Sequence, residues 1–187
     1  MTANKGDQTE DEERKNTDHY GRTPLMIALE CGNCQVVTEI FKSLRDKDIE
    51  TTDSDDNNIF HFACMSETSG EVMITLLSEM RKRNNHQTQV MLGKGNTNKD
   101  TPIHILARKN TCSNEEFLRI NEFINASDMN VLMGNVNSRT ETPIHISAKK
   151  GSTNFMEYAI GIEEEAFNLK RLLKRGDEDG NTPLSTK

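Results

Sequence analysis

The sequence predicts an all-α protein in which helix-turn-helix units stack one upon another. Three observations predict this fold: one short segment recurs along the chain, apolar residues follow its copies at helical spacing, and the composition favours a thin core. Only 33% of the 187 residues are hydrophobic and 5% are aromatic. So few apolar residues suit an elongated core better than one large globular core.

Five copies of one segment align on a threonine or asparagine: GRTPLMIAL from Gly21, NNIFHFAC from Asn57, DTPIHILA from Asp100, ETPIHISA from Glu141 and GNTPLSTK from Gly180. These copies resemble the T-P-L-H motif of the ankyrin-repeat family. DHYGRTPLMIALECGNCQVVTEIFKSL resembles an ankyrin unit over nearly its whole length, whereas the second copy departs most, with Asn58 in place of threonine. The resemblance covers residues 18–187 and implies an ankyrin-repeat solenoid with loop or β-turn fingers.

The spacing of the copies exceeds the roughly 33 residues of an ordinary ankyrin unit. We expect a flexible polar tail over residues 1–17. The expected units are 18–52, 53–95, 96–136, 137–176 and a truncated fifth at 177–187. The extra length falls in the polar, Asn- and Gly-rich stretches 84–99 and 125–139, which we expect to be long loops. A further insertion is expected at 67–70, between the two helices of the second unit.

The recurring Thr-Pro predicts the start of each first helix, because a threonine oxygen caps a helix and proline suits its first turn. Apolar stripes predict the second helices. The stripes are Val36, Val37, Ile40, Phe41 and Leu44; Val72, Met73, Leu76, Leu77 and Met80; and Phe117, Ile120 and Ile124. Each stripe needs a neighbouring unit to cover it. An extra or extended helix is expected over 163–175, with Ala166, Leu169, Leu172 and Leu173 on one face.

Two patterns are typical of metal or redox sites, and we interpret both as structural. Cys31 and Cys34 form a CxxC pair, but no second pair supplies the further ligands that a zinc site needs. Residual thiol reactivity at Cys31 remains an alternative. His61, His104 and His145 occupy one register position, so stacking spaces them too widely to share one ion. The ankyrin resemblance implies that these histidines join neighbouring loops through hydrogen bonds.

No motif in the sequence indicates catalysis or a cofactor, and we expect neither a catalytic nor a metal site. The net charge of −7 argues against nucleic-acid binding. No apolar run approaches the roughly 18 residues of a membrane span. The four cysteines follow no secreted framework, so we expect a cytoplasmic location and no membrane contact by this segment. The basic run at 81–83 is expected to serve a helix C-terminus, with a basic docking patch as the alternative.

The resemblance implies a non-catalytic interaction module, such as an adaptor, scaffold or inhibitor, that grips another protein with loop tips and the concave helix face. The positions carried over from the family are His19, Tyr20, Arg22, Glu30, Ser54, Asp55, Asn57, Met65, Thr97, Asn98, Asp100, Arg108, Lys109, Ser138, Arg139, Glu141, Lys149 and Lys150. The loop at 53–56 is acidic, and two of the first helices end in basic pairs. This pattern predicts a bipolar face that fits a partner with basic and acidic segments.

The long, irregular units also resemble the cytoplasmic ankyrin region of TRPA-type cation channels. Because the fifth unit stops inside a first helix, the alternative hypothesis is a fragment of such a channel, whose full-length form would be membrane-anchored. A remote third alternative is an enzyme.

Overall fold

Four short helices begin at the recurring segment and form the inner row of the molecule. The computed structural model describes residues 16–83, 87–124, 126–161 and 169–185. The inner row comprises α2 (Pro24–Glu30), α5 (Ile59–Met65), α8 (Pro102–Arg108) and α11 (Pro143–Lys150). As predicted, proline stands in the first turn of α2, α8 and α11. Thr23, Asn58 and Thr142 cap their helices through side-chain oxygens.

A second row of helices packs over the inner row. It comprises α3 (Cys34–Ser43), α6 (Ser69–Lys82), α9 (Asn114–Asn121) and α12 (Thr153–Gly161). The predicted stripes of α6 and α9 are buried, and in α3 Val37 and Phe41 are buried. The stripe prediction was wrong at Val36, which is 40% exposed, because the helical rotation turns it away from Val37.

A third row of short helices was not predicted in full. It comprises α4 (Asp46–Ile49), α7 (Thr88–Gly93), α10 (Ala126–Gly134) and α13 (Leu169–Leu173). The long-loop prediction for 84–99 and 125–139 was therefore wrong. A short apolar cluster inside each polar stretch folds into a helix because Met91, Leu92, Leu132 and Met133 are buried against the inner row. The extra helix predicted at 163–175 is confirmed over α13, while Ala166 lies outside the described residues.

The insertion predicted at 67–70 was also wrong. Ser69 and Gly70 are the first residues of α6, and the distance along the chain from Asn58 to α6 equals that from Thr23 to α3. In the third unit, by contrast, the segment from Thr101 to the start of α9 is two residues longer than the corresponding segment of the first unit.

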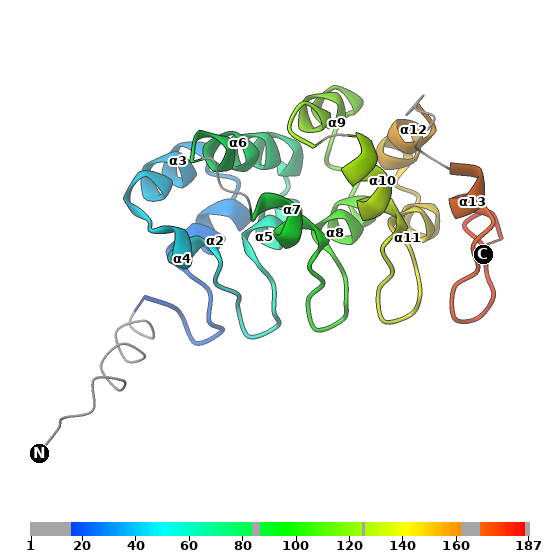
Figure 1. Cartoon of the computed structure of the whole chain (residues 1–187), viewed down its shortest axis with the longest axis horizontal. Coiled ribbons are helices and arrows are strands. Elements are labelled where there is room, and N and C mark those ends of the chain that lie inside the picture. The colour runs from blue at the N-terminus through cyan, green and yellow to red at the C-terminus, as the bar shows by residue number, and fades with distance from the viewer. Residues whose placement is uncertain (1–15, 84–86, 125, 162–168, 186–187) are drawn as a thin grey trace, which may run out of the picture.

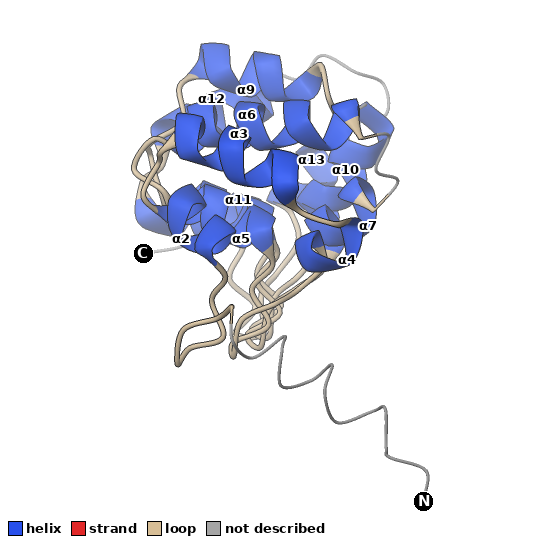
Figure 2. Ribbon diagram, turned by 90° about the vertical axis from the view of Figure 1, so that its left-hand side faces the viewer, coloured by secondary structure: helices blue, strands red, loops and turns tan. Residues whose placement is uncertain are grey.

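The three rows run side by side along the long axis of the molecule (Figure 1). Consecutive inner helices contact one another, and so do consecutive helices of the second row. Viewed along the stack, the inner row and the third row flank the base, the second row covers them, and the loops project below (Figure 2). The described residues contain helices, turns and loops but no strand, which confirms the all-α prediction.

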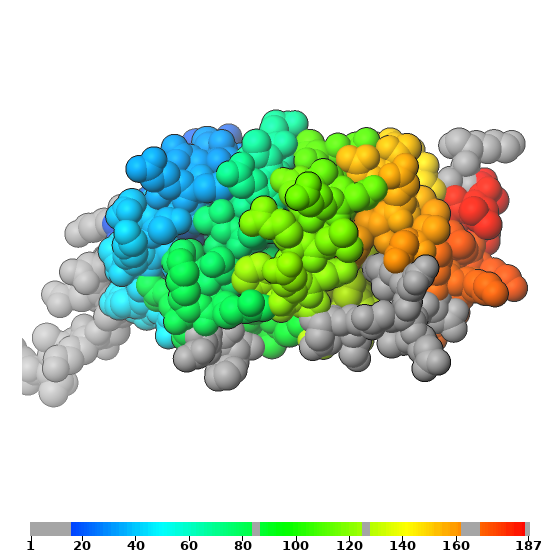
Figure 3. Space-filling view, turned by 90° about the horizontal axis from the view of Figure 1, so that it is seen from above, coloured from blue at the N-terminus to red at the C-terminus, as the bar shows by residue number. Residues whose placement is uncertain are grey.

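Seen from above, the molecule is elongated, and the chain progresses from one end to the other (Figure 3). Among the described residues, no helix has the length and apolar character needed to cross a membrane.

Candidate protein-binding surface

Five loops of nearly identical construction project from one edge of the stack. These finger loops span residues 18–22, 53–57, 96–100, 137–141 and 177–181. In each, the first residue donates its backbone N–H to the carbonyl of the fifth, over 2.9–3.1 Å. The first side chain is aspartate or asparagine, and its Oδ1 accepts hydrogen bonds from two backbone N–H groups of the same loop. The finger loops are therefore internally fixed.

The fourth residue of every finger loop has a positive φ. Gly21 and Gly180 have φ of 77°, whereas Asp56, Lys99 and Thr140 have φ of 62°, 57° and 55°. Glycine adopts this conformation without steric cost, and other residues rarely do. Three finger loops thus carry an exposed side chain at a strained turn position.

Backbone hydrogen bonds join each finger loop to the next. The N–H groups of Ser54, Thr97 and Ser138 donate to the carbonyls of Tyr20, Asp55 and Asn98, each over 2.9 Å. Glu178 continues the series by donating to Arg139 over 3.2 Å. The four bonds hold the five tips at fixed positions relative to one another.

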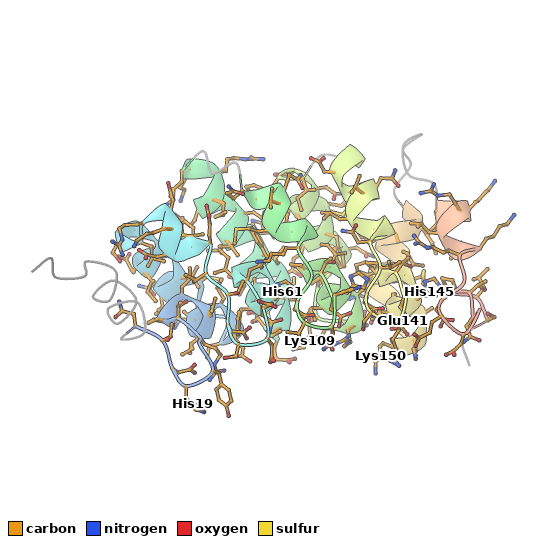
Figure 4. The ribbon with its side chains drawn as sticks, turned by 60° about the horizontal axis from the view of Figure 1, so that its bottom comes forward. His19, His61, Lys109, Glu141, His145 and Lys150 are labelled. Carbon is orange, nitrogen blue, oxygen red and sulfur yellow. The ribbon has the colours of Figure 1, made fainter. Side chains whose placement is uncertain are left out.

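The three recurring histidines are buried and make a second connection between units; Figure 4 labels His61 and His145. His61 Nε2 lies 2.9 Å from the carbonyl oxygen of Asp100, and His104 Nε2 lies 3.0 Å from that of Glu141. Each Nδ1 accepts a hydrogen bond from the backbone N–H at the head of its helix, so Nε2 carries the proton and donates. The hydrogen bonding implied by the ankyrin resemblance is thus present. His145 instead donates to the carbonyl of Arg175, over 2.8 Å, ahead of the fifth finger loop.

Burial keeps His61 and His104 neutral. It lowers the pKa of His61 to about 4, although the Asp100 carbonyl and nearby carboxylates favour the charged form. Burial is also the largest effect on His104, and the pKa of that ring is lowered. These two rings therefore act as fixed hydrogen-bond donors near neutral pH.

Six of the predicted partner-binding residues form ion pairs with one another. The last residue of a finger loop pairs with the residue eight positions later, at the end of the inner helix. These pairs are Arg22–Glu30 at 3.2 Å, Asp100–Arg108 at 2.7 Å and Glu141–Lys149 at 3.0 Å. The first pair has the reverse sign order of the other two. A repeated spacing of opposite charges was the sequence signal for these pairs, which were not predicted.

Glu141 is the centre of the most buried of these networks. Its side chain is 3% exposed and accepts hydrogen bonds from Asn137 at 3.1 Å and from Lys149. Burial opposes its ionisation, but the bonds from Asn137 and Lys149 outweigh that effect, so the pKa of Glu141 is lowered. Asn57, Asp100 and Glu141 are all buried, which places them beneath the surface that a partner could touch.

The predicted bipolar charge pattern is reduced by these internal pairs. Lys109 donates to Glu67 at 2.7 Å and to the carbonyl of Met65, while Arg108 and Lys149 are paired as above. Lys150 is exposed at the end of α11 (Figure 4). The acidic part of the pattern remains, because Asp55 and Asp56 are exposed on the second finger loop.

The predicted residues that do share one exposed surface are those of the finger tips. Tyr20 is 55% exposed, its ring centroid lies 3.8 Å from that of His19, and the Arg22 guanidinium lies 5.2 Å from its ring. Figure 4 shows His19 at the end of the first finger loop, directed away from the helices. The other exposed tip residues are Ser54, Asp55, Thr97, Asn98, Ser138 and Arg139.

The basic run at 81–83 joins neighbouring helices. Arg83 donates to the carbonyls of Phe41 and Leu44 at the end of α3, the latter over 2.8 Å. Arg81 donates to the carbonyl of Glu122, and its guanidinium lies 4.1 Å from the Phe123 ring. These arginines serve the C-termini of neighbouring helices, in addition to the end of their own.

The CxxC pair lies at the turn between α2 and α3. Cys31 follows the last residue of α2 and is exposed, whereas Cys34 begins α3 and is partly buried. Burial raises the pKa values of the other two thiols, at Cys64 and Cys112, above the ordinary range. Within the described ranges, no group of three or more His, Cys, Asp or Glu side chains is placed to hold a metal ion.

Comparison with known proteins adds no family assignment to this geometry. No protein-family model matches the sequence, and no curated protein matches it either.

Proposed function

We propose that the chain is an ankyrin-type solenoid and acts as a non-catalytic protein–protein interaction module, in the manner of an adaptor, scaffold or inhibitor. Recurring Thr-Pro starts, stacked helix pairs and histidine bonds between units support the ankyrin type. Binding is assigned to the row of finger tips.

The proposal rests mainly on the observation that hydrogen bonds hold the backbone of the finger tips in place. Each loop is closed by its own hydrogen bonds and joined to the next by a backbone bond. Exposed side chains on a fixed backbone lose little conformational entropy when a partner binds, which favours affinity. The side chains at equivalent tip positions differ from loop to loop, so the row presents a specific pattern.

The chemistry of the first two tips indicates the kind of partner. Tyr20 offers an exposed aromatic face, and aromatic residues are enriched among the residues that dominate binding energy. Asp55 and Asp56 extend from the adjacent loop. A partner with a lysine or arginine next to an apolar side chain fits this end of the row.

The test is affinity capture from cells that express the protein, followed by calorimetry with the purified partner. Tyr20→Ala and Asp55→Lys are expected to weaken binding about tenfold each, which corresponds to about 1.4 kcal/mol. The matched control is Glu39→Lys, a charge reversal at an exposed site on α3, with an expected affinity equal to that of the unaltered protein. If neither finger variant changed the affinity of a captured partner, the finger tips would not be the binding surface.

A further inference from the structure

A shallow groove runs between α7 and α10, in the third row of helices. Two adjoining hollows of about 390 Å³ each make up the groove, and they share Gly93 and Asn135. Residues of α7 and α10 line it, and these third-row helices lie on the flank opposite the inner helices (Figure 2). One end of the groove reaches the third finger loop at Lys99 and the start of α8 at Thr101, and the other end lies between α7 and α10.

Two exposed valines line the groove at equivalent positions of the repeat. Val90 in α7 and Val131 in α10 are each 64% exposed. The corresponding residues of the end helices are Lys47 in α4 and Arg171 in α13. Exposed apolar residues thus occupy this position in the two middle helices alone.

Glycines leave the groove open beside the valines. Gly93 and Gly134 end α7 and α10 at equivalent positions. A Cβ added at Gly134 would meet no atom within 4 Å, and one at Gly93 would meet only Leu132, at 3.9 Å. The described residues therefore leave the space directly above these two glycines open.

The charges around the groove differ between its two ends. Among the described residues that line the end near the finger loops, Lys99 alone is charged. Arg175 lies at the same end, because its Nη1 donates to the carbonyl of Gly134 over 3.0 Å. At the other end Asp128 accepts a hydrogen bond from Gln89, across the two helices. The groove therefore attracts a negative charge at the finger-loop end.

We propose that this groove binds a short segment of another protein, in which large apolar side chains are followed by acidic residues. The apolar side chains lie over Val90 and Val131, and the acidic residues lie near Lys99 and Arg175. The open, shallow form of the groove suits an extended peptide, since small-molecule sites enclose most of their ligand. This site acts in addition to the finger tips.

The test measures fluorescence anisotropy with a labelled peptide of about eight residues that holds two leucines followed by two glutamates. Two comparison peptides replace either the glutamates with lysines or the leucines with serines. We expect saturable binding of the first peptide, with a Kd near 100 μM, and at least about tenfold weaker binding of the other two.

Two variants address the groove without disturbing the core. Val90→Asp combined with Val131→Asp is expected to weaken binding at least about tenfold. Lys99→Gly removes the cation at a turn position that favours glycine, so affinity should fall while thermal stability rises. The matched control is Leu118→Asp, at a residue of α9 that is 65% exposed. It should bind the peptide as the unaltered protein does.

Several outcomes would overturn the proposal. One is the absence of saturable binding, and another is equal binding by the valine variant or by the lysine-containing peptide. A concentration-dependent dimer in sedimentation velocity that is abolished by the valine substitutions would assign the groove to a second copy of the chain. A lower melting temperature in the valine variant would mean that the two valines are packed against another part of the same chain, so that the groove is not free to bind a peptide.

Discussion

At the scale of single residues, the finger loops combine fixed geometry with local strain. A glycine stands at the positive-φ position in the first and fifth loops, whereas the third and fourth loops hold Lys99 and Thr140 there. Thr140 is branched at Cβ, and such residues tolerate this conformation least.

Thr140→Gly is expected to stabilise the protein by about 1 kcal/mol, because it relieves the left-handed conformation. For a chain of this size the melting temperature should rise by about 2–4 °C, as measured by differential scanning calorimetry. The control is Ser138→Gly in the same loop, at a residue without positive φ, where glycine should leave stability unchanged or lower it. Equal effects of the two changes would contradict the strain argument.

His61 is expected to make stability depend on pH between about 6.5 and 4. Its folded pKa of about 4 lies below the ordinary value of 6.5. Below pH 6.5 the unfolded chain therefore takes up a proton that the folded chain does not, and unfolding becomes more favourable until the pH reaches the folded pKa. The stability from this residue, about 3 kcal/mol, is fully present above pH 6.5.

The measurement is the free energy of unfolding by urea at several pH values from 7 to 4. His61→Gln should be less stable than the unaltered protein at pH 7, and the difference between the two should shrink as the pH falls. A difference that stays constant over this range would show that His61 is protonated equally in both states.

At the scale of elements, the sequence predicted the helices that begin with Thr-Pro and the most regular stripes. Proline, a capping side chain and apolar spacing act locally, so they can be read without the fold. The helices α7 and α10 were missed because Asn and Gly dominate their surroundings and only short apolar clusters mark them. Their stability comes from burial against the inner row, which is a tertiary effect.

The ion pairs between finger loops and inner helices were missed for a related reason. Arg108 and Lys149 form part of basic pairs in the sequence, and their partners lie eight residues earlier. The finger tips of the candidate surface were predicted from the family resemblance. The sequence could not show which charged side chains at the finger tips are free of internal ion pairs, because those contacts form only in the folded chain.

The two lysines that end α11 should behave differently when reversed. Lys149→Glu places a second negative charge beside the buried Glu141, so we expect a loss of about 1–3 kcal/mol in stability. Lys150→Glu changes an exposed residue and should leave the melting temperature unchanged. Thermal unfolding of both variants is the measurement. Equal melting temperatures would mean that the Glu141–Lys149 pair does not stabilise the folded state.

Acid should reduce the contribution of the same pair. Because the folded pKa of Glu141 is lowered, its contribution is complete above the ordinary value of 4.5 and declines as the pH falls below it.

At the scale of the whole molecule, contacts join mainly neighbouring helices along the row. Stability in such an array depends on the number of neighbours that each unit has. Every residue of α8 from Pro102 to Ala107 is buried, whereas in α13 only Leu172 is buried. Local unfolding therefore exposes more buried surface at the centre of the molecule, and costs more free energy, than at α13.

Hydrogen exchange should reveal this gradient. Amides of α8 are expected to exchange at least about tenfold more slowly than those of α13, with α2 between them. Exchange followed by mass spectrometry of short peptides is the measurement. Uniform protection over the described helices would show that the molecule opens only as a whole.

The histidine bonds give the row of units a chemical direction. In the second and third units the ring donates toward the C-terminal neighbour, and that neighbour accepts through the carbonyl at the end of its finger loop. Each such unit therefore presents a hydrogen-bond donor to one neighbour and a hydrogen-bond acceptor to the other. If such a unit were duplicated within the gene, each histidine would again meet a finger-loop carbonyl of the next unit. If a unit faced the opposite way, its buried histidine and the neighbouring carbonyl would both lack a partner. The array can therefore lengthen by repetition of whole units and still keep each new junction satisfied.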